Sequence, residues 1–425
     1  MLDNSGLGVY MRLLIAEKPS IVSTLKEYEL LSQDIEVVYT FGIGLWRYKL
    51  PKLSFPSIPF TSPPSSLRPQ RFKPRKLLLD GSGKPIISLS DTPTKEEHQA
   101  ALDHLVNYLA DKMPSYTEVI CAVDCDRTGY GSANQLLERV GGAGETPIHC
   151  LYLVSTDRKT VEKAWAKRAD NKWEPDSLAQ QLADQQNAKQ TFDYWWNANS
   201  SVVLSELCKW TGLKAEPLIS KYELMLIALM DSEDRPLNVD EVMRLMDKWR
   251  GTGKYKQDGY IGIGSAMSRM AIFESACRRG ALSVKSDGDK KQYALSRAGK
   301  EFVENLHKKT FDPDLPFRLD NWCRGSDYAA MAKYTRTVFG RQLRHQRQKW
   351  SDGTKLTLVQ LLNGNWGEFS RFIAKEAGVE PTKEKVREAF EMLPADVQDV
   401  AFKHGLSDTV FCNRAEEILR GRLTK

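Results

Sequence analysis

Two apolar β-runs of this chain end abruptly on charged side chains, and this pattern constrains the fold more than any other feature. One run is followed by Asp124 and Asp126, whose spacing places both carboxylates on one face of an extended chain. The other run, at residues 12–16, ends on Glu17 and Lys18. Either run alone would equally fit a Rossmann-like strand that ends in a solvated turn. Together they predict three carboxylates and an ammonium group at one sheet edge, a site for a hard divalent cation.

The first third of the chain continues this alternation of strand and helix patterns. Further β-runs occur at residues 36–40 and 148–154, and helices are expected to begin at Thr92-Pro93 and after Gly129. Apolar residues repeat at helical spacing in each: Leu102, Leu105, Val106 and Leu109 in the first, and Leu136, Leu137 and Val140 in the second. Strands that alternate with helices predict a parallel α/β sheet.

The length of 425 residues allows two to four domains, and the apolar content of 41% is ordinary for globular protein. No apolar run approaches the length of a membrane span. Residues 1–10 lack the features of a signal peptide, and we expect either that Met11 is the true start or that a disordered leader precedes it.

The cysteines and the net charge narrow the class of protein only slightly. Seven cysteines are scattered without a Cys-x-x-Cys pair, which supports neither a zinc ribbon nor a disulfide framework. A reducing, cytoplasmic environment fits this usage best. The net charge of +6 and the pI of about 8.7 favour a polyanionic partner only mildly.

The segment between Leu50 and Lys76 is rich in proline and ends in a basic cluster: Arg68, Arg71, Lys73, Arg75 and Lys76. Proline is unfavourable inside helices and central strands, so we expect an extended excursion from the sheet. Two interpretations of the cluster stay open, a solvated loop and an arm that contacts phosphate groups.

From about residue 156 the pattern becomes mostly helical. Residues 184–203 predict an amphipathic helix with an aromatic core face. A later helix ending at Gly280 is followed by a β-hairpin with strands at 282–284 and 292–295. The hairpin carries Lys285, Lys290 and Lys291. A helix with a basic wing could bind duplex or single-stranded nucleic acid, and a structural three-helix core is the alternative.

The two strand ends resemble the Toprim domain of type IA DNA topoisomerases. In that family a Glu-Lys-Pro-Ser strand end supplies a general acid/base glutamate, and an Asp-x-Asp-Arg-Glu-Gly-Glu strand end binds magnesium. The matching segments here begin at Glu17 and Asp124. The resemblance implies Mg²⁺ at Glu17, Asp124 and Asp126, proton transfer by Glu17, and Lys18 and Arg127 near the scissile phosphate.

Two later segments extend the resemblance. The aromatic helix keeps six positions of a family motif in register: Ala188, Lys189, Asp193, Tyr194, Asn199 and Ser201. Residues 262–269 are similar to the family's Gly-Ile-Gly-Thr-Pro-Ala-Thr-Arg segment. The DNA contacts implied by these segments and by the hairpin are Lys189, Asn199, Ser268, Arg269, Lys285, Lys290 and Lys291.

The chain departs from the family around the cleavage centre. Type IA enzymes attack a phosphodiester with a tyrosine in Tyr-Pro-Arg-Thr-Asp-Ser, which lies between the aromatic helix and the Gly-Ile-Gly segment. The interval here, residues 214–260, lacks that motif and is too short for the arch that carries it. Tyr334 begins a similar Tyr-Thr-Arg-Thr run inside a predicted helix, where a solvated basic helix is the alternative. Thr128 and Tyr130 replace two family glutamates.

We therefore expect an α/β fold with three regions: a Toprim parallel-sheet domain at 11–155, a topoisomerase-like helical and winged-helix-like body at 156–345, and a small helical C-terminal region at 346–425. The expected function is that of a type IA topoisomerase-like, Mg²⁺-binding protein, an isomerase by resemblance, that prefers single-stranded DNA. Two alternatives remain, a catalytically inactive DNA-binding accessory protein and a Toprim-type nuclease.

Overall fold

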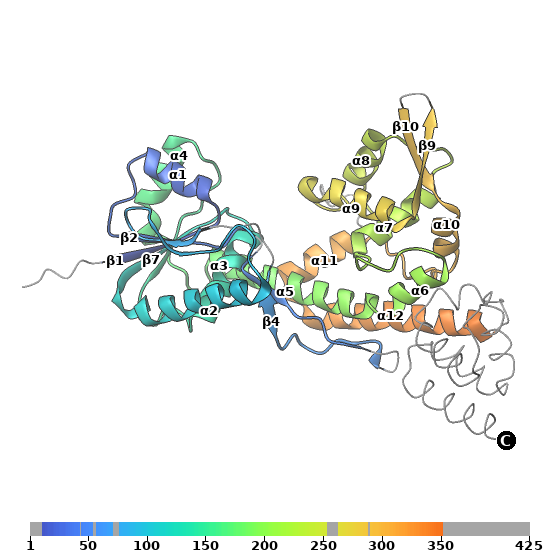
Figure 1. Ribbon diagram of the computed structural model, residues 1–425, viewed down its shortest axis with the longest axis horizontal. Helices are drawn as coiled ribbons and strands as arrows, with labels where there is room; N and C mark the ends of the chain where they lie inside the picture. The colour runs from blue at the N-terminus through green and yellow to red at the C-terminus, as the bar shows by residue number, and fades with distance from the viewer. Residues whose placement is uncertain are drawn as a thin grey trace, which may run out of the picture. The chain divides into compact units, whose positions relative to one another are not determined.

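The computed structural model describes residues 11–42, 44–53, 57–70, 76–252, 262–287 and 290–351 (Figure 1). The described chain forms two compact units. The first consists of the residues up to Lys49, Pro64–Thr191 and Cys323–Asp327, and the second consists of Leu50–Pro63, Phe192–Trp322 and the residues from Tyr328 on. The predicted boundary near residue 155 thus lies inside the first unit. Val161, Ala179 and Ala183, which follow that boundary, are buried in the packing around the sheet.

The first unit is built on a six-stranded sheet in the order β6-β5-β2-β1-β7-β8. The strands are β1 (Met11–Ala16), β2 (Ile35–Tyr39), β5 (Lys76–Leu79), β6 (Pro85–Ser88), β7 (Tyr116–Ala122) and β8 (Ile148–Cys150). The pairs β1–β2, β1–β7 and β7–β8 are parallel, whereas β5 and β6 add antiparallel pairs at one edge. The predicted parallel α/β sheet is therefore confirmed as a mostly parallel one.

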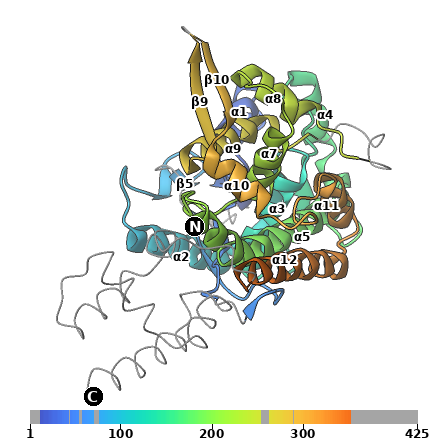
Figure 2. The same ribbon diagram turned by 90° about the vertical axis from the view of Figure 1, so that its right-hand side faces the viewer.

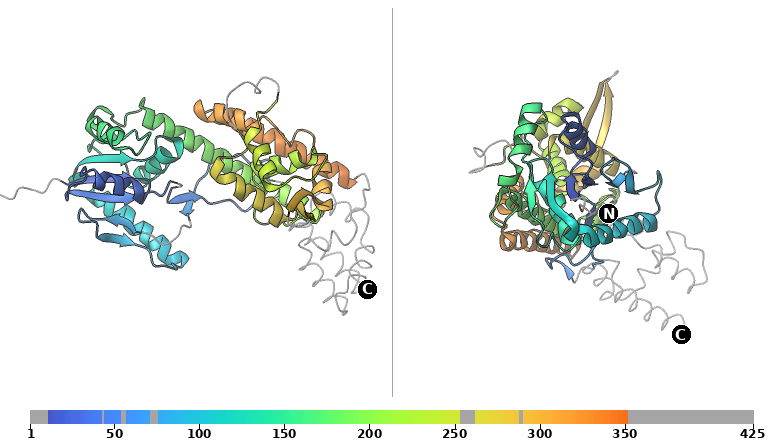
Figure 3. Two further views of the ribbon diagram at one scale, coloured as in Figure 1. Left: turned by 90° about the horizontal axis from the view of Figure 1, so that it is seen from above. Right: turned by 90° about the vertical axis from the view of Figure 1, so that its left-hand side faces the viewer.

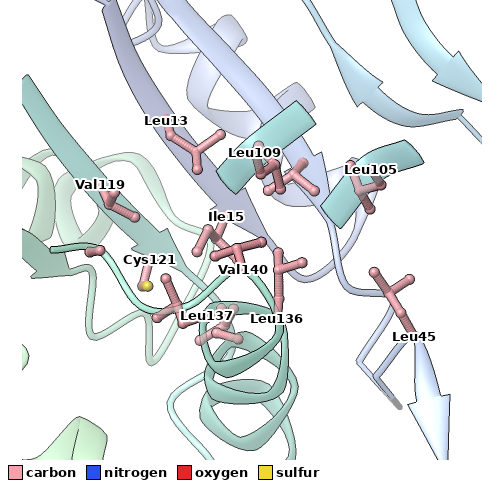
Figure 4. Close-up of a cluster of buried hydrophobic side chains, with 14 of the residues drawn as sticks. Leu13, Ile15, Leu45, Leu105, Leu109, Val119, Cys121, Leu136, Leu137 and Val140 are labelled. Atoms are coloured by element: carbon pink, nitrogen blue, oxygen red, sulfur yellow. The ribbon is translucent and has the colours of Figure 1, made fainter. Parts of the chain in front are cut away.

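Helices cover both faces of this sheet (Figure 1). Helices α1 (Pro19–Glu27) and α4 (Arg158–Ala166) pack on the face that carries Leu14 and Ala16 of β1. Helices α2 (Lys95–Lys112) and α3 (Arg127–Arg139) pack on the opposite face, where Leu13 and Ile15 meet Leu105, Leu109, Leu136 and Leu137 (Figure 4). This alternation along one strand is what a parallel sheet buried on both faces requires.

Helix α2 begins two residues later than the sequence predicted. Thr94, rather than Thr92, is the N-cap, and Thr94 and Glu97 form a reciprocal capping box. A short antiparallel ribbon also belongs to this unit and consists of β3 (Trp46–Tyr48) and β4 (Leu67–Pro69). Strand β4 lies inside the segment 50–76, which the sequence predicted as an extended excursion. Two 3₁₀ turns, Met113–Ser115 and Arg168–Asp170, lie elsewhere in the same unit.

The second unit is mostly helical, as predicted. Helix α5 (Leu178–Ser200) begins in the first unit and ends in this one. It is followed by α6 (Val203–Trp210), α7 (Lys221–Asp231), α8 (Val239–Lys248), α9 (Ala266–Arg279), α10 (Arg297–Glu304), α11 (Leu315–Arg324) and α12 (Tyr328–Ser351). Aromatic side chains form part of its interior: Phe192, Trp196, Trp322, Tyr334 and Phe339.

The predicted hairpin is present as β9 (Leu282–Asp287) and β10 (Lys290–Leu295). Helices α7, α8 and α9 pack together beside it, and the hairpin projects from this group (Figures 2 and 3). Leu237, between α7 and α8, forms an antiparallel bridge with Tyr293 of β10, and the Tyr293 ring stands edge-on to Phe273 of α9. Three helices, a bridging segment and a hairpin therefore form one packed group.

Several predictions fall partly or wholly outside the described residues. They include the leader at residues 1–10 and the residues Arg71, Lys73 and Arg75 of the basic cluster. They also include the C-terminal region predicted at 346–425, whose first six residues are the end of α12. Within the described part of the chain, no helix is long and apolar enough to cross a membrane.

Candidate functional site

The candidate site lies where the carboxyl ends of β1 and β7 meet. Strand β1 is the point at which the strand order reverses, since β2 lies on one side of it and β7 on the other. Ligands of open α/β sheets bind in the crevice outside such a switch point. Glu17 directly follows β1, and its N–H donates to the carbonyl of Ala122, the last residue of β7, at 3.2 Å. The two strand ends are thus joined at the site.

Hydrogen bonds bring the predicted side chains together. The Asp124 backbone N–H donates to Oε2 of Glu17 at 2.8 Å, and Nζ of Lys18 donates to Oδ2 of Asp124 at 2.6 Å. Asp126 is the N-cap of α3, where its Oδ1 accepts the Gly129 N–H at 2.8 Å. The structure therefore places Glu17, Lys18 and Asp124 in direct contact, with Asp126 beside them. Arg127 follows as the first residue of α3 and is half-buried.

Two glycines let the backbone close around the Glu17 carboxylate. A Cβ on Gly42, whose φ is +73°, would lie 2.7 Å from Oε1 of Glu17. A Cβ on Gly129 would lie 2.9 Å from Oε2 and 2.5 Å from the Asp124 carbonyl oxygen. A side chain at either position would displace the carboxylate. The sequence analysis missed Gly42, although a Gly-x-Gly run just after the β2 pattern was the available signal.

The electrostatics of the site favour a proton on Glu17. Burial is the main cause that raises the pKa of Glu17, and the charges of Asp124 and Asp126 raise it further. The Asp124 N–H and the Lys18 charge act in the opposite direction. The pKa of Lys18 is raised chiefly by its hydrogen bond to Asp124, so its ammonium group stays charged. A carboxyl group that accepts a proton readily beside a fixed cation suits acid–base chemistry.

This electrostatic arrangement predicts a pH-dependent stability. Because the folded-state pKa of Glu17 exceeds its ordinary value of 4.5, its contribution to stability is present below pH 4.5 and is lost as the pH rises through the folded-state pKa. In EDTA, Glu17→Gln should therefore melt higher than the parent at pH 7 and equally at pH 4. The exposed Glu27→Gln is the control. A difference that does not vary with pH would contradict this cause.

The carboxylates of Glu17, Asp124 and Asp126 are suitable ligands for Mg²⁺, but the Lys18 ammonium occupies one oxygen of Asp124. Within the described residues, no group of three or more His, Cys, Asp and Glu side chains is arranged to hold a metal ion. Each carboxylate has one oxygen engaged by a protein donor, and Lys18 lies on Oδ2 of Asp124. Mg²⁺ takes one or two carboxylates and keeps several waters. Coordination through that oxygen would require the Lys18 ammonium to move away.

Thr128 and Tyr130 stand where the proteins that the strand ends resemble carry glutamates, and they add no acidic group to the site. The Tyr130 side chain is fully buried, and its hydroxyl donates to the Leu151 carbonyl at 3.4 Å. Its ring packs against Tyr152 and Trp173. Tyr130 is therefore part of the core beside α3.

The predicted DNA contacts of the second unit differ in their burial and in the partners that they have within the protein. Asn199 is completely buried, and its amide is used by Phe60 and Trp195, so its assignment as a DNA contact is wrong. Arg269 pairs with Asp247 at 2.6 Å, and only 15% of its side chain is exposed. The Ser268 hydroxyl lies 3.0 Å from the Ser265 hydroxyl.

The remaining predicted DNA contacts are lysines, and those whose side chains the structure describes differ in their exposure. Lys291 on β10 is exposed. Lys189 on α5 belongs to the first unit and is half-buried. The side chains of Lys285 and Lys290 lie outside the described residues.

The structure also locates Tyr334, the weak candidate for a nucleophile. Its hydroxyl is buried inside the second unit, and its ring packs against Trp322 and Phe192. Burial, followed by the charge of Asp312, raises the pKa of Tyr334 well above its ordinary value. A buried phenol with a raised pKa is poorly suited to attack a phosphodiester.

Comparison with known proteins found no family model and no curated protein that matches this chain.

Proposed function

We propose that this protein is a DNA-binding, type IA topoisomerase-like protein with a Toprim-type Mg²⁺ site. The observation that carries the proposal is the contact among Glu17, Lys18 and Asp124 at the adjoining ends of two parallel strands, with Asp126 beside them. Glu17, Asp124 and Asp126 would hold the ion. A bound Mg²⁺ neutralises phosphate charge, while Glu17 is suited to hold or release a proton and Lys18 to contact the phosphate.

The second unit supports a nucleic-acid partner through its fold. The order α7, bridging Leu237, α8, α9 and hairpin β9–β10 resembles that of a winged helix, a common DNA-binding unit, and this resemblance supports the proposal. The wing carries an exposed lysine at 291. The exposed face of α9, by contrast, includes Met267 and Met270, which is unusual for a helix that reads duplex base edges. Single-stranded DNA, held through its phosphates, fits this surface better than sequence-specific duplex.

A Toprim-type nuclease is the second candidate, and the buried Tyr334 hydroxyl favours it over tyrosine-mediated cleavage. Hydrolysis needs a metal-activated water and no tyrosine. Denaturant trapping with labelled single-stranded DNA and Mg²⁺ should therefore yield no covalent adduct. An adduct that disappears in Tyr334→Phe would restore a true topoisomerase.

Supercoiled plasmid incubated with the protein and Mg²⁺ separates the candidate functions. Relaxed circles indicate a topoisomerase, nicked circles a nuclease, and unchanged plasmid with retained binding an accessory protein. If about five phosphates are neutralised, the logarithm of single-strand affinity should fall against the logarithm of salt concentration with a slope near −3.5. A flat response, or no binding at low salt, would reject the DNA-binding proposal.

Asp124 gives the direct test of the metal site. Asp124→Asn should weaken Mg²⁺ binding measured by calorimetry at least about tenfold, since loss of a ligand costs no less than loss of its outer-shell partner. Asp111→Asn, at an exposed position of α2, is the matched control and should bind as the parent does. Unchanged Mg²⁺ affinity in Asp124→Asn, with the fold retained, would reject this site.

A further inference from the structure

The first unit contains a cavity that is lined by charged side chains. This cavity lies apart from the strand ends that form the proposed metal site. It encloses about 1080 Å³ between the β3–β4 ribbon and the first turns of α2. Arg47 of β3 and Arg68 of β4 line one wall, and Lys95, His98 and Gln99 of α2 line the other. Its volume is in the range of pockets that bind small organic ligands.

The arginine pair is the main reason to expect an anion there. Arg47 lies directly opposite Arg68 in the antiparallel register, and both are exposed. Such cross-strand neighbours have Cβ atoms about 5 Å apart and project from the same face of the ribbon. Trp46, beside them in sequence, is buried on the other side of the ribbon with the Arg139 guanidinium over its ring. One phosphate placed between the two guanidinium groups can accept hydrogen bonds from both.

The α2 wall adds a second source of positive potential. Helix α2 has 18 residues, and its capping box engages the N–H groups of Thr94 and Glu97. The first N–H groups of a helix have no partner within the helix, and the helix dipole favours negative charge at this end. Lys95 and Glu96, whose backbone carries such groups, both line the cavity.

Carboxylates on the same side limit what the cavity accepts. Asp91, Glu96 and Asp103 line it as well, so three carboxylates accompany the three cationic side chains of Arg47, Arg68 and Lys95. The two arginines stand together on the ribbon, whereas the carboxylates belong to α2 and the loop before it. A ligand that fits both walls carries a phosphate at one end and hydrogen-bond donors at the other, which is the chemistry of a nucleotide.

We propose that this cavity binds a nucleotide, with its phosphate between Arg47 and Arg68 and its base or sugar donors against Asp91, Asp103 and Gln99. The nucleotide can come from a DNA strand or from the free pool, because both present the same phosphate and donor groups. This site is separate from the metal-binding carboxylates, and its occupancy does not depend on Mg²⁺.

Binding assays in EDTA test the proposal and exclude the metal site. The probes are a fluorescent dT₁₅ oligonucleotide, the four deoxynucleoside monophosphates and inorganic phosphate. We expect binding that Arg47→Met/Arg68→Met weakens at least about tenfold, since each lost charge-assisted hydrogen bond contributes that much. Arg47→Lys/Arg68→Lys keeps the charges but loses the planar guanidinium groups. Its affinity for the probes should therefore lie between those of the parent and of the double Met variant. Arg158→Met on α4 should bind each probe as the parent does.

The pattern across the probes decides the source of the nucleotide. Weakened binding of both dT₁₅ and monophosphates supports a site for free nucleotides as well as strands, and weakened binding of dT₁₅ alone supports a site for a strand. Equal affinity for phosphate and monophosphates overturns the nucleotide assignment, as does unaltered binding in the double Met variant. Absence of binding by every probe also overturns it. Melting curves that match the parent confirm that the ribbon variants are folded.

Discussion

An Arg279→Met variant is expected to unfold its second unit about 10 °C below the parent, the largest effect anticipated for any single substitution here. Arg279 and Glu223 form a buried ion pair with the Nε–Oε1 distance at 2.7 Å, and their side chains are 0% and 2% exposed. The guanidinium also donates to the carbonyls of Lys214 and Pro217, at 2.6 Å each. Removal of Arg279 leaves a buried carboxylate without its counter-charge, which costs about 3–5 kcal/mol.

Calorimetric melting of three variants checks this cause. Arg279→Met/Glu223→Leu should recover part of the loss, because apolar partners avoid the unpaired charge. Arg158→Met removes an exposed pair with Glu162 on α4 and should leave the melting temperature nearly unchanged. If Arg279→Met and Arg158→Met melt alike, or if the double variant is no better than the single one, the buried pair is not what stabilises the unit.

An Asn199→Ala variant should release the segment at residues 57–63 from α5. The Asn199 side chain accepts the Phe60 N–H at 2.8 Å and donates to the carbonyls of Phe60 and Trp195, at 2.7 Å each. Its loss leaves backbone groups of Phe60 unpaired at a cost of about 2–3 kcal/mol. Proteolysis within this segment should therefore become more than tenfold faster, because cleavage follows the population of the open form.

Two further variants isolate the role of the amide. Asn197→Ala changes a half-buried asparagine on the same helix and should be cleaved as slowly as the parent. Asn199→Asp keeps an acceptor for the Phe60 N–H but repels the two carbonyls, so it should resemble the alanine variant. Slow cleavage of both Asn199 variants would show that other contacts, such as the Trp195 indole on the Ser62 carbonyl, suffice to hold the segment.

The sequence predicted those site residues whose position follows from a local rule. A β-run followed by a carboxylate places that carboxylate at a strand end, and the parallel sheet brings Glu17 and Asp124 together without further information. Gly42 could not be assigned in this way, because its role depends on β2 and β1 lying side by side. The short antiparallel strands β5 and β6 were missed, because no element was predicted between the excursion, which ends at Lys76, and the helix expected from Thr92.

Buried polar residues caused the errors of the sequence analysis. Asn199 matched a motif of the family that the chain resembles, which suggested contact with DNA, and no partner was predicted for Arg279. The structure gives each of them partners that are far away in sequence, Phe60 for Asn199 and Glu223 for Arg279. The sequence does not show whether a polar side chain is hydrated by solvent or forms hydrogen bonds with a buried partner. Only the tertiary packing distinguishes these two states.

The excursion at residues 50–63 gives the chain an interleaved architecture. The polypeptide passes between the two units after Lys49, Pro63, Thr191, Trp322 and Asp327, so neither unit is a contiguous stretch of sequence. A truncation point between Pro63 and Trp322 therefore removes part of both units, and no single contiguous gene fragment encodes either unit alone. Deletions that reach into the region between these two points will accordingly disrupt two cores at once, and either unit can be exchanged only by replacing several segments together.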